Sequence, residues 1–116
     1  MRNDKENIIV NLTFQFVFDI IAFSEHIQSL KKYRLADQLF RSGTSIGANV
    51  SEAQNAESKA DFIHKLKIAA KEADETQYWL KLCSESKHYP TNEKLSSDIE
   101  SIIKVLSKII SSSKSN

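Results

Sequence analysis

Apolar side chains recur along this chain at alternating steps of three and four, the spacing of helices that each bury one face. In the first such stretch the stripe consists of Ile9, Leu12, Phe16, Ile20, Phe23, Ile27 and Leu30. Short polar joints, one of them containing Pro90, interrupt the pattern three times. The pattern therefore predicts four helices, over about 7–31, 34–55, 59–87 and 92–111.

The joints between the predicted helices are short, so consecutive helices should lie side by side and run antiparallel. Only 2 Gly and 1 Pro in 116 residues favour long helices over a turn-rich β fold. The length suits one domain over residues 1–116. We expect an all-α, antiparallel, up-down-up-down four-helix bundle. Residues 1–6 and 111–116 should fray, Pro90 should end the third helix, and Thr91 or Asn92 should cap the fourth.

The first helix carries a second apolar set, offset from the first by about 140°. Its members are Val10, Phe14, Val17, Phe18 and Ile21. A helix in an isolated bundle buries one face, so the second set indicates an oligomer interface. The alternative is one wide stripe that spreads over a broad groove.

Two further features point to close contacts. Gly43 and Gly47 lie four apart in the second helix, where each glycine costs about 1 kcal/mol relative to alanine, which suggests close approach of a neighbouring helix or subunit. Ile68 and Trp79 lie on a mixed face of the third helix, although one partly exposed tryptophan would be ordinary. The predicted oligomer interface is Phe14, Val17, Phe18, Ile21, Gly43, Gly47, Ile68 and Trp79.

Polar residues flank the apolar stripes of the second and third helices, and shielded charges need partners. Folding this hairpin about Glu57 brings Arg41 level with Glu72. We expect Arg41 and Ser45 to bond to Glu72, with Glu75 joining them, and loss of the Arg41 side chain to destabilise the fold or assembly. The predicted interhelical network comprises Arg41, Ser45, Asn49, Glu52, Glu72 and Glu75.

Spaced motifs between about Tyr33 and Leu82 resemble the "four helix bundle protein" family, first found encoded in intervening sequences of bacterial large-subunit ribosomal RNA genes. The motifs are Ser45-Ile46-x-x-Asn49-x-x-Glu52-Ala53, Ser58-Lys59-x-Asp61-Phe62 and Lys71-Glu72-Ala73-x-Glu75-Thr76-x-x-Trp79-Leu80. The resemblance implies a bacterial homopentamer without established enzymatic activity. A related branch, the accessory variability determinants, is basic and associates with a reverse transcriptase and nucleic acid.

The composition of the chain limits the kinds of partner that the protein can bind. Formal net charge is +1, so the strong basic excess of a nucleic-acid-binding protein is absent. Lys31, Lys32 and Arg34 form a basic joint that can contact phosphates or simply be a solvated turn. The lone Cys83, which falls on the core stripe, fits a reducing cytoplasm. We find no signal peptide and no run of about 20 apolar residues, and expect no membrane partner.

Catalytic, cofactor and metal sites are not indicated. A di-iron bundle needs two Glu-x-x-His pairs and further carboxylates at mid-bundle. The chain has one such pair, Glu85 with His88, and the similar Asp61 with His64 at the other end of that helix. We therefore expect a non-enzymatic, self-assembling cytoplasmic protein that associates with RNA or a nucleic-acid enzyme. The alternative is an adaptor that binds a foreign protein through its second apolar face.

Overall fold

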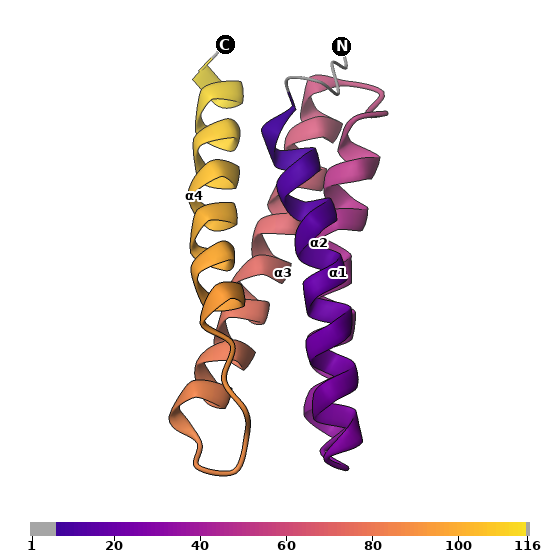
Figure 1. The fold of residues 1–116 in the computed structure, drawn as a ribbon. Coiled ribbons are helices and arrows are strands. Elements are labelled where there is room, and N and C mark those ends of the chain that lie inside the picture. The colour runs from indigo at the N-terminus through magenta and orange to yellow at the C-terminus, as the bar shows by residue number, and fades with distance from the viewer. Residues whose placement is uncertain (1–6, 116) are drawn as a thin grey trace.

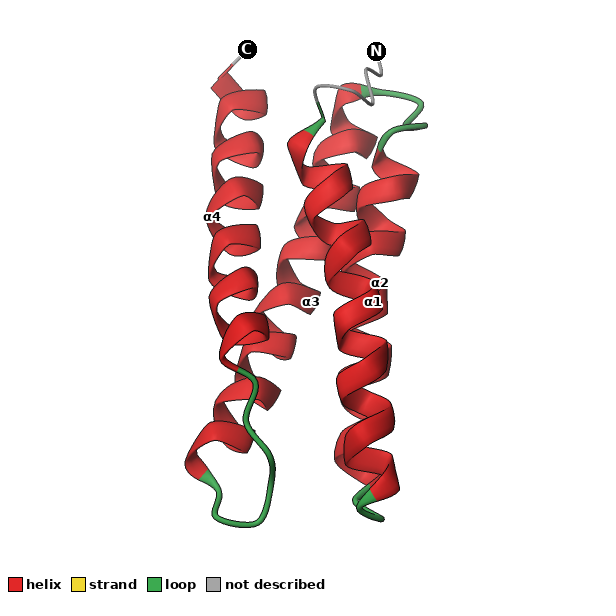
Figure 2. Cartoon of the chain, viewed as in Figure 1, coloured by secondary structure: helices red, strands yellow, loops and turns green. Residues whose placement is uncertain are grey.

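The computed structural model describes residues 7–115, all of them in helices and connecting loops (Figures 1 and 2). The expectation for residues 1–6 lies outside this range. The helices are α1 (Ile8–Ser29), α2 (Tyr33–Ala53), α3 (Lys59–Glu85) and α4 (Glu93–Ser115). The predicted all-α class and the four helices are confirmed.

The four helices form an elongated bundle with extents of 47 × 22 × 20 Å. Each helix packs against its neighbours in sequence, and α1 also contacts α4, which closes the bundle. Figure 1 shows the start of α1, the end of α4 and the α2–α3 joint at one end. The α1–α2 joint and the longer α3–α4 loop lie at the opposite end, called here the distal end.

The contact between α1 and α4 is the least extensive of the four, and one cation spans it. Lys94 Nζ on α4 lies 2.8 Å from Asp19 Oδ2 on α1 and 2.9 Å from Asp98 Oδ2 on α4. The hydrogen bonds to these two carboxylates raise the pKa of Lys94 above its ordinary value.

The core follows the predicted stripes, with polar exceptions. Ile9, Phe16, Ile20, Phe23 and Ile27 of α1 are buried as expected. Leu30 is not, because the helix ends at Ser29 and leaves Leu30 as its exposed C-cap. The remaining buried apolar residues are Ala36, Leu39, Ile46, Val50, Ala53, Leu66, Ala69, Ala73, Leu80, Cys83, Leu95, Ile99, Ile102 and Leu106.

Two helix ends differ from the expectation. The α3 helix ends at Glu85, well before Pro90, and Ser86 is its C-cap, so the proline does not set the end. The predicted frayed tail is wrong up to Ser115, because Ile109 and Ile110 pack against the core and hold the last turns of α4. At its start, Asn92 caps α4: its Oδ1 accepts a hydrogen bond from the Leu95 N–H at 2.9 Å.

By length and composition, α1 could cross a membrane, since its most apolar window has a mean hydropathy of 1.5. This is weak evidence, because the core helix of a soluble bundle has the same composition. Here one face of α1 packs into the core and includes the polar side chains of Thr13 and Ser24. The Thr13 hydroxyl bonds to the Ile9 carbonyl oxygen at 2.8 Å.

Candidate interaction surfaces

The second apolar set of α1 faces outward. Phe14 and Phe18 are 61% and 55% exposed, and their rings meet edge to face with centroids 5.1 Å apart. Val17 and Ile21 are half-buried beside them. We call Phe14, Val17, Phe18 and Ile21 the α1 outer face. The chain's own helices cover Val17 and Ile21 in part and leave the two phenylalanine rings exposed.

The two glycines of α2 serve the contact with α1 of the same chain. A Cβ at Gly43 would lie 2.7 Å from Ile20 Cγ1, so α1 approaches α2 to within a distance that only glycine allows. Gly43 is buried, and its place in the predicted oligomer interface is therefore wrong. A Cβ at Gly47 would lie 3.1 Å from Val17 Cγ2.

Gly47 is only half-buried and opens onto a shallow groove of about 290 Å³ beside the α1 outer face. Phe14 and Val17 line one side of the groove, and Thr44 and Ala48 of α2 line the other. The small residues of α2 thus leave a groove beside the exposed ring of Phe14. That shape suits packing against a complementary surface.

A polar network lies on the seam between α2 and α3. Arg41 Nη1 bonds to Glu72 Oε1 at 3.2 Å, and Arg41 Nη2 bonds to Glu75 Oε2. Gln38 Oε1 accepts from Arg41 Nε at 3.2 Å and from Nη2 at 3.1 Å. Trp79 Nε1 donates to Glu75 Oε2 at 3.0 Å. The structure therefore joins Arg41, Glu72 and Glu75 as predicted, and adds Gln38 and Trp79.

Three predicted members do not belong to this network. Ser45 donates to the Arg41 carbonyl oxygen at 2.7 Å, and Asn49 Nδ2 donates to the Ser45 carbonyl oxygen at 2.9 Å. Both side chains thus satisfy their own helix rather than crossing to α3. Glu52 pairs instead with Lys65 at 2.9 Å, nearer the α2–α3 joint.

The register across the seam explains a contact that the sequence did not predict. Ser42 and Thr76 are fully buried, and the Thr76 hydroxyl donates to Ser42 Oγ at 2.8 Å. Folding about Glu57 had placed Ser42 opposite Glu72, one helical turn away from its true partner. Alternating small and hydroxyl side chains carry no signal for such a pair, because either residue could equally bond to its own backbone.

The three cationic residues of the basic joint have different surroundings. Lys31 has φ 66°, and its N–H bonds to the Gln28 carbonyl oxygen at 2.8 Å. The Lys32 N–H reaches the Ile27 carbonyl oxygen at 3.3 Å, which completes a Schellman motif at the end of α1. The Lys32 ammonium lies over the Tyr89 ring, 4.9 Å from its centroid. Arg34 makes no hydrogen bond or ion pair within the described residues.

A groove of about 440 Å³ opens at the distal end of the α2–α3 seam, and we call it the distal groove. Its lining residues are Arg34, Leu35, Gln38, Trp79, Leu82, Ser86 and Tyr89. Leu82 is 43% exposed, whereas Trp79 and Tyr89 are half-buried. Ile68, also half-buried, lies nearer the middle of α3 and outside the groove.

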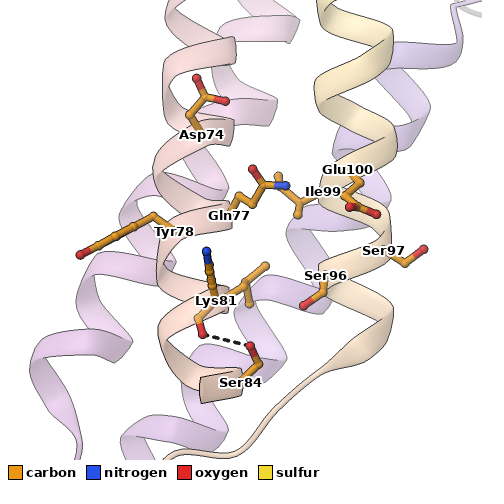
Figure 3. Close-up of a pocket in the computed structure, with 10 residues that line it drawn as sticks. Asp74, Gln77, Tyr78, Lys81, Ser84, Ser96, Ser97, Ile99 and Glu100 are labelled. Carbon is orange, nitrogen blue, oxygen red and sulfur yellow. Dashed lines mark hydrogen bonds between the residues drawn. The ribbon is translucent and has the colours of Figure 1, made fainter. Parts of the chain in front are cut away.

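A larger groove of about 660 Å³ lies between α3 and α4 (Figure 3). Asp74 and Lys81 of α3 and Glu100 of α4 line it, and the carboxylates and the ammonium make no ion pair with one another. Ser84 Oγ donates to the carbonyl oxygen of Lys81 at 2.9 Å. Residues 7–115 contain no group of three or more His, Cys, Asp or Glu side chains placed to hold a metal ion.

Cys83 is buried in the core, where loss of solvation raises the pKa of its thiol to about 11. A thiol in this state is a poor nucleophile at neutral pH. It packs as a small apolar side chain, as the helical pattern predicts.

These observations define the class of the protein: a small antiparallel four-helix bundle with an uncovered apolar helix face. The chain belongs to the family of 23S rRNA-intervening sequence proteins, whose sequence model matches residues 5–110. A solved structure of a protein of unknown function from the S23 ribosomal protein family of Bacteroides thetaiotaomicron is 39% identical to this chain. The match covers 89% of this chain and 98% of that one, with a TM-score of 0.83. No curated protein matches the chain.

Proposed function

We propose that this protein is a non-enzymatic, self-assembling bundle of the cytoplasm, and that its α1 outer face packs against another copy of the chain. The observation that carries the proposal is the exposure of Phe14 and Phe18 on a face with no charged residue among its members. Each phenylalanine that leaves water on assembly contributes roughly 1.5–3 kcal/mol. The assembly is the homopentamer that the resemblance implies.

A cyclic pentamer needs two different surfaces on each subunit, because its contacts are head to tail. The α1 outer face supplies one. For the second we propose the α2–α3 seam from Ile68 to Trp79, where an apolar side chain and an indole flank the Arg41 network. The α1 outer face lies on α1 and the seam lies between α2 and α3, so the two surfaces are different, as the head-to-tail contacts of a ring require.

The test is the double variant Phe14→Glu, Phe18→Glu. Because both side chains are more than half exposed in the single chain, the variant should fold normally. Its assembly should fail, since the interface would bury two unpaired carboxylates. Native mass spectrometry should give an oligomer for the wild type and a monomer for the variant.

Lys104→Glu is the matched control. Lys104 lies exposed on α4, outside both proposed surfaces, and its replacement changes the charge by the same two units as the double variant. This variant should assemble like the wild type. A wild-type protein that stays monomeric at high micromolar concentration would contradict the proposal and favour the adaptor, with a foreign protein on the α1 outer face.

Association with RNA is the second proposed role, and its support is narrower. Lys31 and Arg34 are exposed at the distal end without a hydrogen-bond or ion-pair partner in the described part of the chain. Lys32 is engaged with Tyr89. Two cations per subunit give weak phosphate binding, but a ring would present several such pairs on one rim.

A further inference from the structure

The distal groove combines an apolar floor with an unpaired cation. Leu35, Trp79 and Leu82 provide the apolar walls, and Arg34 lies at the edge. Its volume of about 440 Å³ suits one or two large side chains of a ligand. Arg34 is the charged residue of the lining, and the Gln38 side-chain oxygen already accepts two hydrogen bonds from Arg41, so Arg34 is the group best placed to pair with a charged ligand.

The surroundings of the groove are positively charged. Residues 30–38 and 79–91, which supply the lining, hold five cations, Lys31, Lys32, Arg34, Lys81 and Lys87, against the two carboxylates of Asp37 and Glu85. Further along the seam, Arg41 pairs with both Glu72 and Glu75, a net charge of −1 that leaves the groove end positive. A ligand for this groove is therefore anionic as well as apolar.

Each of the two aromatic rings of the groove already has a neighbour within the chain. The Lys32 ammonium covers the Tyr89 ring, and Tyr78 meets the Trp79 ring at 65° with centroids 5.3 Å apart. A nucleobase needs a free aromatic face on which to stack. An aliphatic or phenyl side chain needs only the apolar walls. A nucleobase stacked on Tyr89 would have to displace the Lys32 ammonium, which favours a peptide over a nucleic acid.

We propose that the distal groove binds an acidic peptide segment of another protein, with a large apolar side chain seated between Leu35, Trp79 and Leu82 and a carboxylate paired with Arg34. This goes beyond self-assembly. Trp79 lies where the proposed second contact surface meets the groove, whereas Arg34, Leu35 and Leu82 belong to the groove alone. An assembly would then keep the Arg34 side of the groove open for one such peptide on each subunit.

Trp79 is the only tryptophan of the chain, so its fluorescence reports on the groove directly. The probe is a capped peptide in which a Leu-Phe pair is flanked by Asp and Glu residues. Titration should shift the Trp79 emission and saturate. Arg34→Glu should weaken the apparent affinity by about tenfold or more, since it replaces a charge-assisted hydrogen bond by repulsion.

Leu82→Asp should also abolish the shift, and both changed side chains are exposed, so the variants should fold. Lys104→Glu, with the same charge change on an exposed position of α4, should bind like the wild type. A peptide with Lys in place of its acidic residues should not bind.

Three outcomes would overturn the proposal. The first is no saturable shift with the acidic peptide, and the second is equal binding by Arg34→Glu and the wild type. The third is a shift produced by an oligouridylate, or by raising the concentration of the Phe14→Glu, Phe18→Glu monomer alone, because the occupant would then be RNA or a second copy. The titrations use this monomer, because assembly of the wild type would itself change the surroundings of Trp79.

Discussion

At the scale of single residues, two glycines with the same spacing and type have different surroundings. Gly43 faces the fully buried Ile20, whose atoms a Cβ would meet at 2.7 and 2.8 Å. Gly47 faces the half-buried Val17, which has room to move. The sequence marks both positions as close contacts, but only the packing decides which glycine is required.

This difference in packing predicts that alanine destabilises the protein at position 43 but has little effect on stability at position 47. Gly43→Ala should destabilise the protein by about 1–3 kcal/mol, because the added methyl overpacks the contact with α1. Gly47→Ala should be near neutral, since a helix-propensity gain of up to about 1 kcal/mol offsets a small displacement of Val17. Urea unfolding of both variants measures the two changes in stability, and equal midpoints would contradict the predicted difference.

At the scale of the elements, the end of α1 is held by a Schellman motif that lacks its usual glycine. Lys31 occupies the left-handed position with φ 66°, where a Cβ is crowded by its own backbone. The basic joint therefore carries conformational strain in addition to its charge. Removing the side chain at such a position relieves the backbone strain and should stabilise the turn.

Lys31→Gly should accordingly stabilise the protein by about 0.5–1 kcal/mol. Lys31→Ala is the matched control, because it removes the same charge but keeps the Cβ, and it should give no gain. The measurement is the urea midpoint with an unchanged m-value. A similar rise in both variants would show that charge, rather than backbone conformation, sets the stability of the turn.

At the scale of the whole molecule, charge bears on the RNA proposal. Within the basic joint, Lys31 and Arg34 are the cations available to phosphates, because Lys32 lies over Tyr89. The monomeric Phe14→Glu, Phe18→Glu variant should therefore bind single-stranded RNA weakly. The logarithm of its affinity should fall against the logarithm of salt with a slope of about −1.4, from about 0.7 per phosphate contact.

The assembled wild type should bind more tightly and show a steeper slope, because one RNA strand can contact several subunits. A gel-shift series over a range of salt concentrations measures both. If neither protein binds at low salt, the RNA role is wrong. Binding that is independent of salt would show that phosphate contacts do not carry it.

Most of the fold could be predicted from the chain itself, because helical periodicity depends on local spacing. The buried positions of α4 and the cap at Asn92 were found in this way. The ends of α3 and α4 were not, since Pro90 suggests a stop that Ser86 supplies earlier, and the serines after residue 110 suggest fraying although α4 continues to Ser115.

The candidate surfaces were predicted only in part. The exposure of Phe14 and Phe18 follows from one helix having two apolar sides. The pairing of Arg41 with Glu72 and Glu75 also follows from antiparallel folding, since a long side chain tolerates an error of one turn. The short side chains of Ser42 and Thr76 tolerate none, and their contact was missed.

The sequence by itself determined the four helices, their antiparallel order and the apolar excess of α1, because each follows from the identity of residues three and four apart. The tertiary structure decided the register of α2 against α3, which glycine is essential, and the meeting of Arg34, Trp79 and Tyr89 in one groove. Those features depend on how far one helix slides and rotates against another. Side-chain packing sets that displacement, and no local pattern records it.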